Sequence, residues 1–178
     1  SDGDSLTYLW EQRDLGPKVA LGTADNGTSP LFRVLTPVAE STRYLPKLST
    51  VVAGIQDDAE IIPSLAREMD FRLTARDGHG GVASDDMMIN VVATPSYLSS
   101  FSLSEPTVGG ESLGSNATVR WNVADTNSSP ISADTMDFYP STDGGVTFSA
   151  TPFDSKPNTG YARVTFPSGV QTATARLM

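Results

Sequence analysis

The sequence predicts an all-β protein made of two small domains. Short segments that alternate apolar and polar residues recur along the 178 residues, and turn residues separate them at intervals of about 8–12. A helical period of apolar residues is almost absent. This pattern is typical of sandwiches, so we predict two immunoglobulin-like β-sandwiches in tandem, over residues 1–95 and 96–178.

The first domain is predicted to form around two strands, each next to an acidic turn. Residues 6–11 follow the turn Asp2-Gly3-Asp4 and place Leu6, Tyr8 and Trp10 on one face. We therefore expect Trp10 to be a core residue rather than a ligand platform.

The second strand of this domain, over residues 68–76, shows the clearest alternation in the chain. It leads into the turn at 77–81, where glycines supply positive φ angles. A last strand is expected over 86–93, and Pro95 marks the domain boundary.

Between these strands the pattern is weaker. We expect a polar loop over residues 20–30, a short strand over 31–35 and a single helical turn over 48–52. The acidic cluster at 57–60 is expected to be a solvated loop.

The second domain repeats the same alternation, with Val119, Trp121 and Val123 on one strand face. Trp121 is predicted to be a core residue. Asp143-Gly144-Gly145 indicates a hairpin. Further strands are expected over 135–139, 146–148, 160–166 and 172–178.

The charge and the apolar runs exclude some partners. The net charge of −9 argues against nucleic acid, which requires clustered lysine and arginine. No apolar run approaches the roughly 20 residues of a membrane span, so membrane insertion is not expected. The absence of cysteine excludes disulfides and thiolate chemistry.

The residues give little support for catalysis. His79 is the only histidine, whereas the zinc-peptidase signature H-E-x-x-H needs two histidines one helical turn apart. The nucleophile-elbow sequence G-x-S-x-G is also absent from the chain. We therefore expect this chain not to be an enzyme and to have no catalytic residues.

Calcium is the one cofactor that the sequence suggests. The turn before the tryptophan strand and the last hairpin lie at the same end of an immunoglobulin-like sandwich. Asp2, Asp4 and Asp77, with Asp85 or Asp86, would then supply the oxygen ligands that Ca²⁺ prefers. The alternative is that these aspartates only form turns, a role in which their side chains are favoured.

Several motifs resemble those of a known family. Asp-Gly-Asp-x-Leu-Thr-Tyr-x-Trp at 2–10 and the hairpin sequence FRLTARDG-x-GG at 71–81 resemble bacterial PKD and cadherin-like modules. A longer set of segments resembles the region after the catalytic domain of secreted, reprolysin-like zinc metallopeptidases of marine Gram-negative bacteria: WEQRDLG, PLFRVLTP, RYLPKL and FRLTARDGHGGVASDDM, followed by VRWNVADTN and YPSTDGGVTF. Ala75 and Arg76 depart mildly from the family pattern.

The resemblance implies a secreted bacterial protein and a non-catalytic accessory role, as a spacer or as a binder of substrate or of a surface. The expected partners are the parent's catalytic domain or an extracellular protein or polysaccharide surface. It also implies that the first strands of one module and the last strand of the other are missing, so dimerisation or strand exchange through open edges is expected. The alternative reading is a fragment of a bacterial adhesin or cell-surface stalk.

Overall fold

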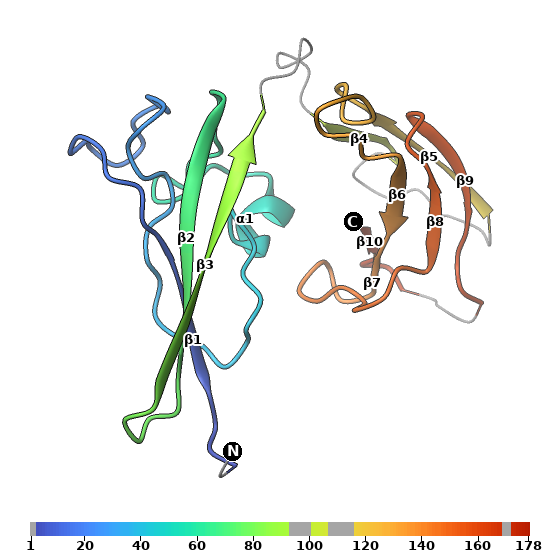
Figure 1. The fold of residues 1–178 in the computed structure, drawn as a ribbon. Coiled ribbons are helices and arrows are strands. Elements are labelled where there is room, and N and C mark those ends of the chain that lie inside the picture. The colour runs from blue at the N-terminus through green and yellow to red at the C-terminus, as the bar shows by residue number, and fades with distance from the viewer. Residues whose placement is uncertain (1–2, 93–100, 107–115, 169–171) are drawn as a thin grey trace. The chain divides into compact units, whose positions relative to one another are not determined.

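The structure is a computed structural model that describes residues 3–92, 101–106, 116–168 and 172–178. These residues form antiparallel sheets and a single helix of six residues, which confirms the all-β class (Figure 1). The chain divides into two compact units, Ser1–Val92 and Ala93–Met178. Among the described residues, no helix has the length and apolar character needed to cross a membrane.

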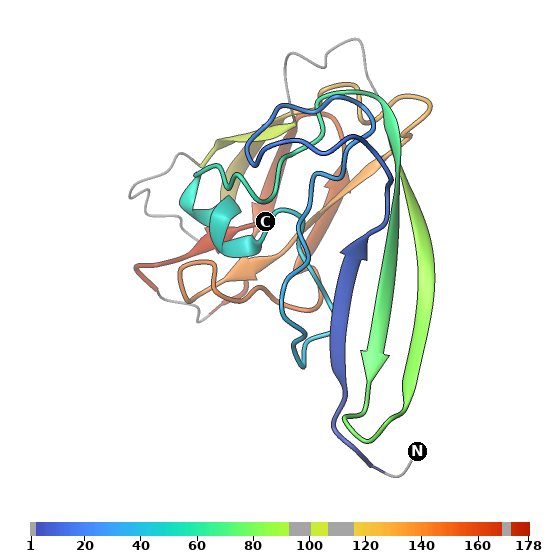
Figure 2. The same cartoon turned by 90° about the vertical axis from the view of Figure 1, so that its left-hand side faces the viewer.

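Unit 1 is built on one antiparallel sheet of three strands. Its order is β1 (Thr7–Gln12), β2 (Arg67–Arg76) and β3 (Val82–Val91), with β2 in the centre. The three strands lie side by side in Figure 2, and β2 and β3 form a long hairpin that ends beside the N-terminal segment. β3 begins at Val82, four residues earlier than expected, because its pairing with β2 continues to the turn.

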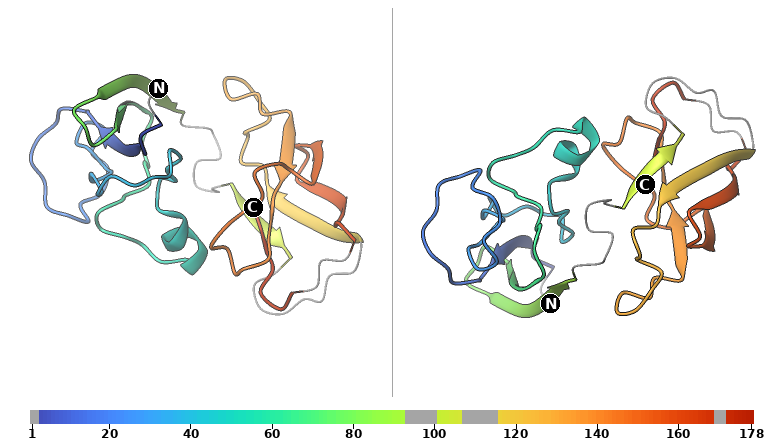
Figure 3. Two further views of the ribbon diagram at one scale, coloured as in Figure 1. Left: turned by 90° about the horizontal axis from the view of Figure 1, so that it is seen from below. Right: turned by 90° about the horizontal axis from the view of Figure 1, so that it is seen from above.

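One face of this sheet carries the core of unit 1. Met69 and Phe71 of β2 pack against Leu31 and Phe32, and Trp10 is partly buried against the same cluster. Viewed along the strands, the loops of unit 1 and α1 (Leu48–Ala53) lie on this side of the sheet (Figure 3). The helical turn expected over 48–52 is therefore confirmed.

The strand expected over residues 31–35 does not form. Within the described residues, that segment makes only an isolated bridge between Phe32 and Glu60. Side-chain contacts replace the ladder there, because Gln12 Oε1 accepts hydrogen bonds from the N–H groups of Leu31 and Phe32 at 2.7 and 2.9 Å. Leu31 and Phe32 still reach the core, whereas Val34 is exposed.

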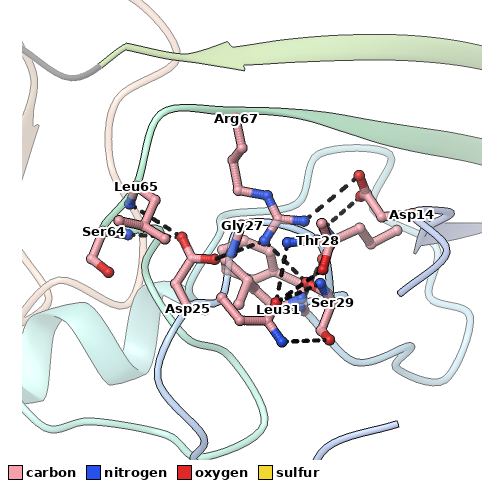
Figure 4. Close-up of polar contacts among 12 residues, drawn as sticks. Asp14, Asp25, Gly27, Thr28, Ser29, Leu31, Ser64, Leu65 and Arg67 are labelled. Atoms are coloured by element: carbon pink, nitrogen blue, oxygen red, sulfur yellow. Dashed lines mark hydrogen bonds and ion pairs between the residues drawn. The ribbon is translucent and has the colours of Figure 1, made fainter. Parts of the chain in front are cut away.

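A buried ion pair fastens the polar loop at 20–30 to the sheet. Arg67 Nη1 at the start of β2 lies 2.9 Å from Asp25 Oδ1, and both side chains are almost fully buried. Asp25 also accepts hydrogen bonds from the N–H groups of Gly27, Ser64 and Leu65. Figure 4 shows these contacts converging on the carboxylate, with Asp14 on the other side of the guanidinium.

The pKa of Asp25 makes this contact sensitive to acid. Burial alone would raise that pKa, but hydrogen bonds from backbone N–H groups and from Arg67 lower it overall. The resulting stability is complete above the unfolded-state pKa of about 3.9 and is lost as the pH falls through the lower folded-state pKa. At pH 5 we expect Asp25→Asn to have a lower free energy of unfolding than wild type in urea. This difference in free energy should narrow as the pH falls towards about 2.5. A difference in free energy of unfolding that stays constant with pH would contradict the lowered pKa of Asp25.

The described residues of unit 2 form three small antiparallel sheets. Their strands are β4 (Ser102–Glu105), β5 (Asn116–Asn122) and β9 (Tyr161–Thr165); β6 (Thr135–Phe138) and β8 (Asp154–Pro157); and β7 (Pro140–Ser141) and β10 (Arg176–Leu177). Trp121 lies in the core of this unit, in edge contact with Phe138 at 5.8 Å between ring centroids. Its indole N–H donates to Asn158 Oδ1 at 2.7 Å. The prediction for Trp121 is therefore confirmed.

Of two strands predicted in unit 2, one does not form and the other is shorter than expected. Residues 146–148 form no strand, because the Asp143 carboxylate binds the N–H and hydroxyl of Thr147 and closes a local loop. These hydrogen bonds lower the pKa of Asp143 well below its usual range. In the described part of the 172–178 segment, only β10 pairs as a strand.

Candidate functional site

The predicted acidic site is partly assembled at the hairpin end of unit 1. Asp77 Oδ1 accepts hydrogen bonds at 2.8 Å from the N–H groups of His79 and Gly81, and so holds the turn closed. His79 Nδ1 lies 3.3 Å from Asp4 Oδ2, which places Asp4 beside the same turn. Asp2 lies outside the described residues.

Asp86 does not join this group. It lies opposite Arg72 in the ladder, four residues from Val82 at the hairpin end of β3 and therefore about 13 Å along the strand. Arg72 donates to its two carboxylate oxygens at 2.6 and 2.7 Å. This contact with Arg72 lowers the pKa of Asp86.

Over the described residues, no three acidic, histidine or cysteine side chains gather as a metal would require. Calcium binding at Asp4 and Asp77 stays a prediction. Thermal unfolding with and without millimolar calcium tests it, since an unchanged midpoint would remove the candidate.

A groove lies on the surface of unit 1. It has a volume of about 610 Å³ and opens between β1 and the segment at residues 34–48. Its walls are mainly aromatic and aliphatic: Tyr8, Trp10, Val34, Val38, Tyr44 and Leu48. We call this feature the aromatic groove.

The groove exists because β1 pairs with the segment at residues 34–38 through a single residue pair. Tyr8 and Val38 exchange two backbone hydrogen bonds, at 2.7 and 3.0 Å. Beyond that pair, the guanidinium of Arg43 separates the two segments. It donates to the carbonyl of Trp10 and to the carbonyl of Arg33, each at 2.9 Å.

Glu60 fixes Arg43 in this position. Its side chain is fully buried, and its Oε1 lies 2.6 Å from Arg43 Nη2. Its Oε2 accepts a hydrogen bond from the N–H of Lys47 at 2.8 Å. The prediction of a solvated loop at 57–60 is therefore wrong for Glu60, because its partner lies 17 residues away and supplies a buried countercharge.

The side chain of Trp10 contacts both the core of unit 1 and the aromatic groove. The ring packs against the core cluster of unit 1, as the alternation of β1 predicts, and it also lines the groove. Its indole N–H donates to the carbonyl of Ser41 at 2.8 Å, which fixes the ring. Sequence reasoning missed the groove, although the aromatic and aliphatic residues of the segment 34–48 are a signal for it.

Comparison with known proteins gives no relative for this chain. Neither a family model, nor a curated protein, nor a solved structure matches it.

Proposed function

We propose that the chain is a non-catalytic accessory part of a secreted bacterial zinc metalloprotease and that it binds a substrate or an extracellular surface through the aromatic groove. In this proposal the two units are immunoglobulin-like sandwiches. The motif resemblance supports the parent, and the groove supports binding rather than a spacer role.

The clustering of exposed apolar side chains is the observation that carries the proposal. Val34, Val38 and Tyr44 are exposed by 53, 52 and 40 %, and all three line the same groove. Exposed apolar residues that gather in one concave place mark interaction sites, whereas scattered ones need no explanation. The rings of Tyr8 and Trp10 add flat apolar faces beside a polar backbone.

The charges at the groove indicate what kind of surface it accepts. Arg43 directs its donors to the protein's own carbonyls and to Glu60. Lys47 Nζ lies 3.2 Å from Asp57 Oδ2. Glu40 also lines the groove, and its carboxylate accepts a hydrogen bond from the N–H of Thr42 at 3.2 Å. Since these charged groups are engaged within unit 1, ring stacking and apolar contact would dominate binding. This favours a neutral polysaccharide or a neutral stretch of protein.

Replacing Tyr44 with alanine tests the groove. We expect retention on neutral insoluble polysaccharides or on denatured protein to fall about tenfold, because a ring of the groove wall is lost. Tyr161→Ala is the matched control, since Tyr161 is 47 % exposed but belongs to unit 2. Equal losses for both variants, or no retention of wild type, would count against the groove.

The parent is tested separately. We expect the full parent sequence to contain H-E-x-x-H upstream of this region. A parent without that signature would favour the adhesin or cell-surface stalk.

A further inference from the structure

Among the described residues β3 pairs with β2 alone, so its outer edge, on the opposite side of the sheet from β1, is a second surface of unit 1. Seven successive residues, Val82–Met88, are exposed, so neither face of this part of the strand is covered. Met87 and Met88 are exposed by 44 and 55 %. Exposed strand edges of this length are templates for another strand unless charges or proline block them.

The register shows which backbone groups of β3 are available. Arg13 N–H donates to the carbonyl of Asp70, so the even-numbered residues of β2 face β1 and the odd-numbered ones face β3. Their partners in β3 are the odd-numbered residues. The N–H and C=O groups of five residues therefore point away from the sheet: Val82, Ser84, Asp86, Met88 and Asn90.

The charge beside this edge is negative and only partly compensated. Asp86 is paired with Arg72 and Arg13. In contrast, Glu68, Asp70 and Asp85 have no cationic partner in the described part of the chain. Asp85 instead accepts a hydrogen bond from the outward N–H of Asp86 at 3.0 Å. This contact occupies the outward N–H of Asp86.

We propose that the edge of β3 binds an extended, basic segment of a partner protein as a fourth strand. The outward backbone groups would supply the ladder, and a lysine or arginine opposite Asp85 would pair with its carboxylate on the core side of the sheet. Residues opposite Val82, Met87 and Met88 would be apolar.

Charge disfavours a second copy of the chain as the occupant. Antiparallel pairing of β3 with β3 around the middle of the strand would bring two Asp85-Asp86 pairs together. Like charges at facing positions destabilise a sheet. The net charge of −9 on each copy adds to that repulsion.

A pair of synthetic peptides tests the proposal. The probe is a fluorescent peptide of about ten residues that alternates lysine with threonine and valine, and its control carries glutamate in place of lysine. We expect fluorescence anisotropy to show binding of the lysine peptide alone. Hydrogen exchange should show protection at the outward amides, Ser84 and Met88 among them.

Two variants locate the site. Asp85→Lys should weaken binding of the lysine peptide by about fivefold or more and should strengthen binding of the glutamate peptide. Asp58→Lys makes the same charge change at an exposed position in a loop, and it should leave the binding of both peptides unchanged. Ser84→Pro removes one outward N–H without touching the ladder to β2, so far-UV circular dichroism should stay unchanged while binding is lost.

Three results would overturn the proposal. These are equal binding of both peptides, protection of amides elsewhere than β3, and a dimer in sedimentation whose β3 amides are protected without peptide. The last result would make a second copy the occupant. None of these measurements involves the aromatic groove, so the two proposals fail or succeed independently.

Discussion

Replacing Arg67 with methionine is expected to lower the free energy of unfolding of the protein by about 3–5 kcal/mol. The Arg67 side chain is 2 % exposed and that of Asp25 is fully buried, so the variant leaves a carboxylate without its countercharge. The carbonyl of Ser29 also loses its hydrogen bond from Arg67 Nη1, at 3.0 Å. Urea unfolding at neutral pH measures the loss.

The matched control is Arg13→Met. Arg13 also pairs with an aspartate, at 3.3 Å from Asp86, but its side chain is 48 % exposed. An exposed pair of this kind contributes about 0–1 kcal/mol. If both variants lost the same stability, the buried pair would have no special part in holding the loop.

A double variant measures how strongly Asp25 and Arg67 depend on each other. Asp25→Leu with Arg67→Met removes both charges, so the loss should be smaller than the sum of the two single losses. Additive losses would show that Asp25 and Arg67 act independently, and that the other donors to Asp25 carry its contribution.

The regular strands of the protein could be predicted from the sequence because their signal is local. In β2, Met69 and Phe71 alternate with Asp70 and Arg72, and burial follows that alternation as far as Arg72. Beyond it, Thr74 on the opposite face is also buried. Burial also follows the alternation at Val119 and Trp121 in β5. A half-buried strand can be recognised from its alternation of apolar and polar residues, without knowing which segments cover its apolar face.

The loops of unit 1 could not be predicted in this way, because distant side chains hold them. The cluster at 57–60 has the composition of a solvated loop, yet Glu60 is buried against Arg43. The loop at 20–30 looks equally polar, yet Asp25 is buried against Arg67. A charge pattern along the chain gives no indication of which carboxylate will meet a guanidinium from another segment.

The candidate sites also combine features with a local sequence signal and features that depend on long-range contacts. The turn at Asp77 has a local origin, in the hairpin between β2 and β3. Asp4, in contrast, reaches His79 of that turn only because β1 pairs with β2, which is a contact between distant parts of the sequence. The aromatic groove depends on Arg43 reaching Trp10, Arg33 and Glu60 at once. These contacts span up to 33 residues, so no window of sequence contains them.

Replacing Glu60 with alanine is expected to cost about 3–5 kcal/mol of stability and also to abolish binding at the aromatic groove. The change leaves the Arg43 guanidinium in a largely buried place without its carboxylate. It also removes the acceptor of the Lys47 N–H at the start of α1. Asp58→Ala is the control from the same loop, since Asp58 is exposed, and it should stay within about 0.5 kcal/mol of wild type.

Arg43→Lys then distinguishes the shape of the groove from the stability of the unit. Lysine keeps the charge opposite Glu60, but a single ammonium lacks the planar fork that reaches the carbonyls of Trp10 and Arg33 together. We expect this variant to lose less stability than Glu60→Ala in urea, yet to lose groove binding to a similar degree. If Arg43→Lys bound like wild type, the separation of β1 from residues 33–36 would not depend on the guanidinium, and the groove would owe its shape to the packing of Trp10 and Tyr44 instead.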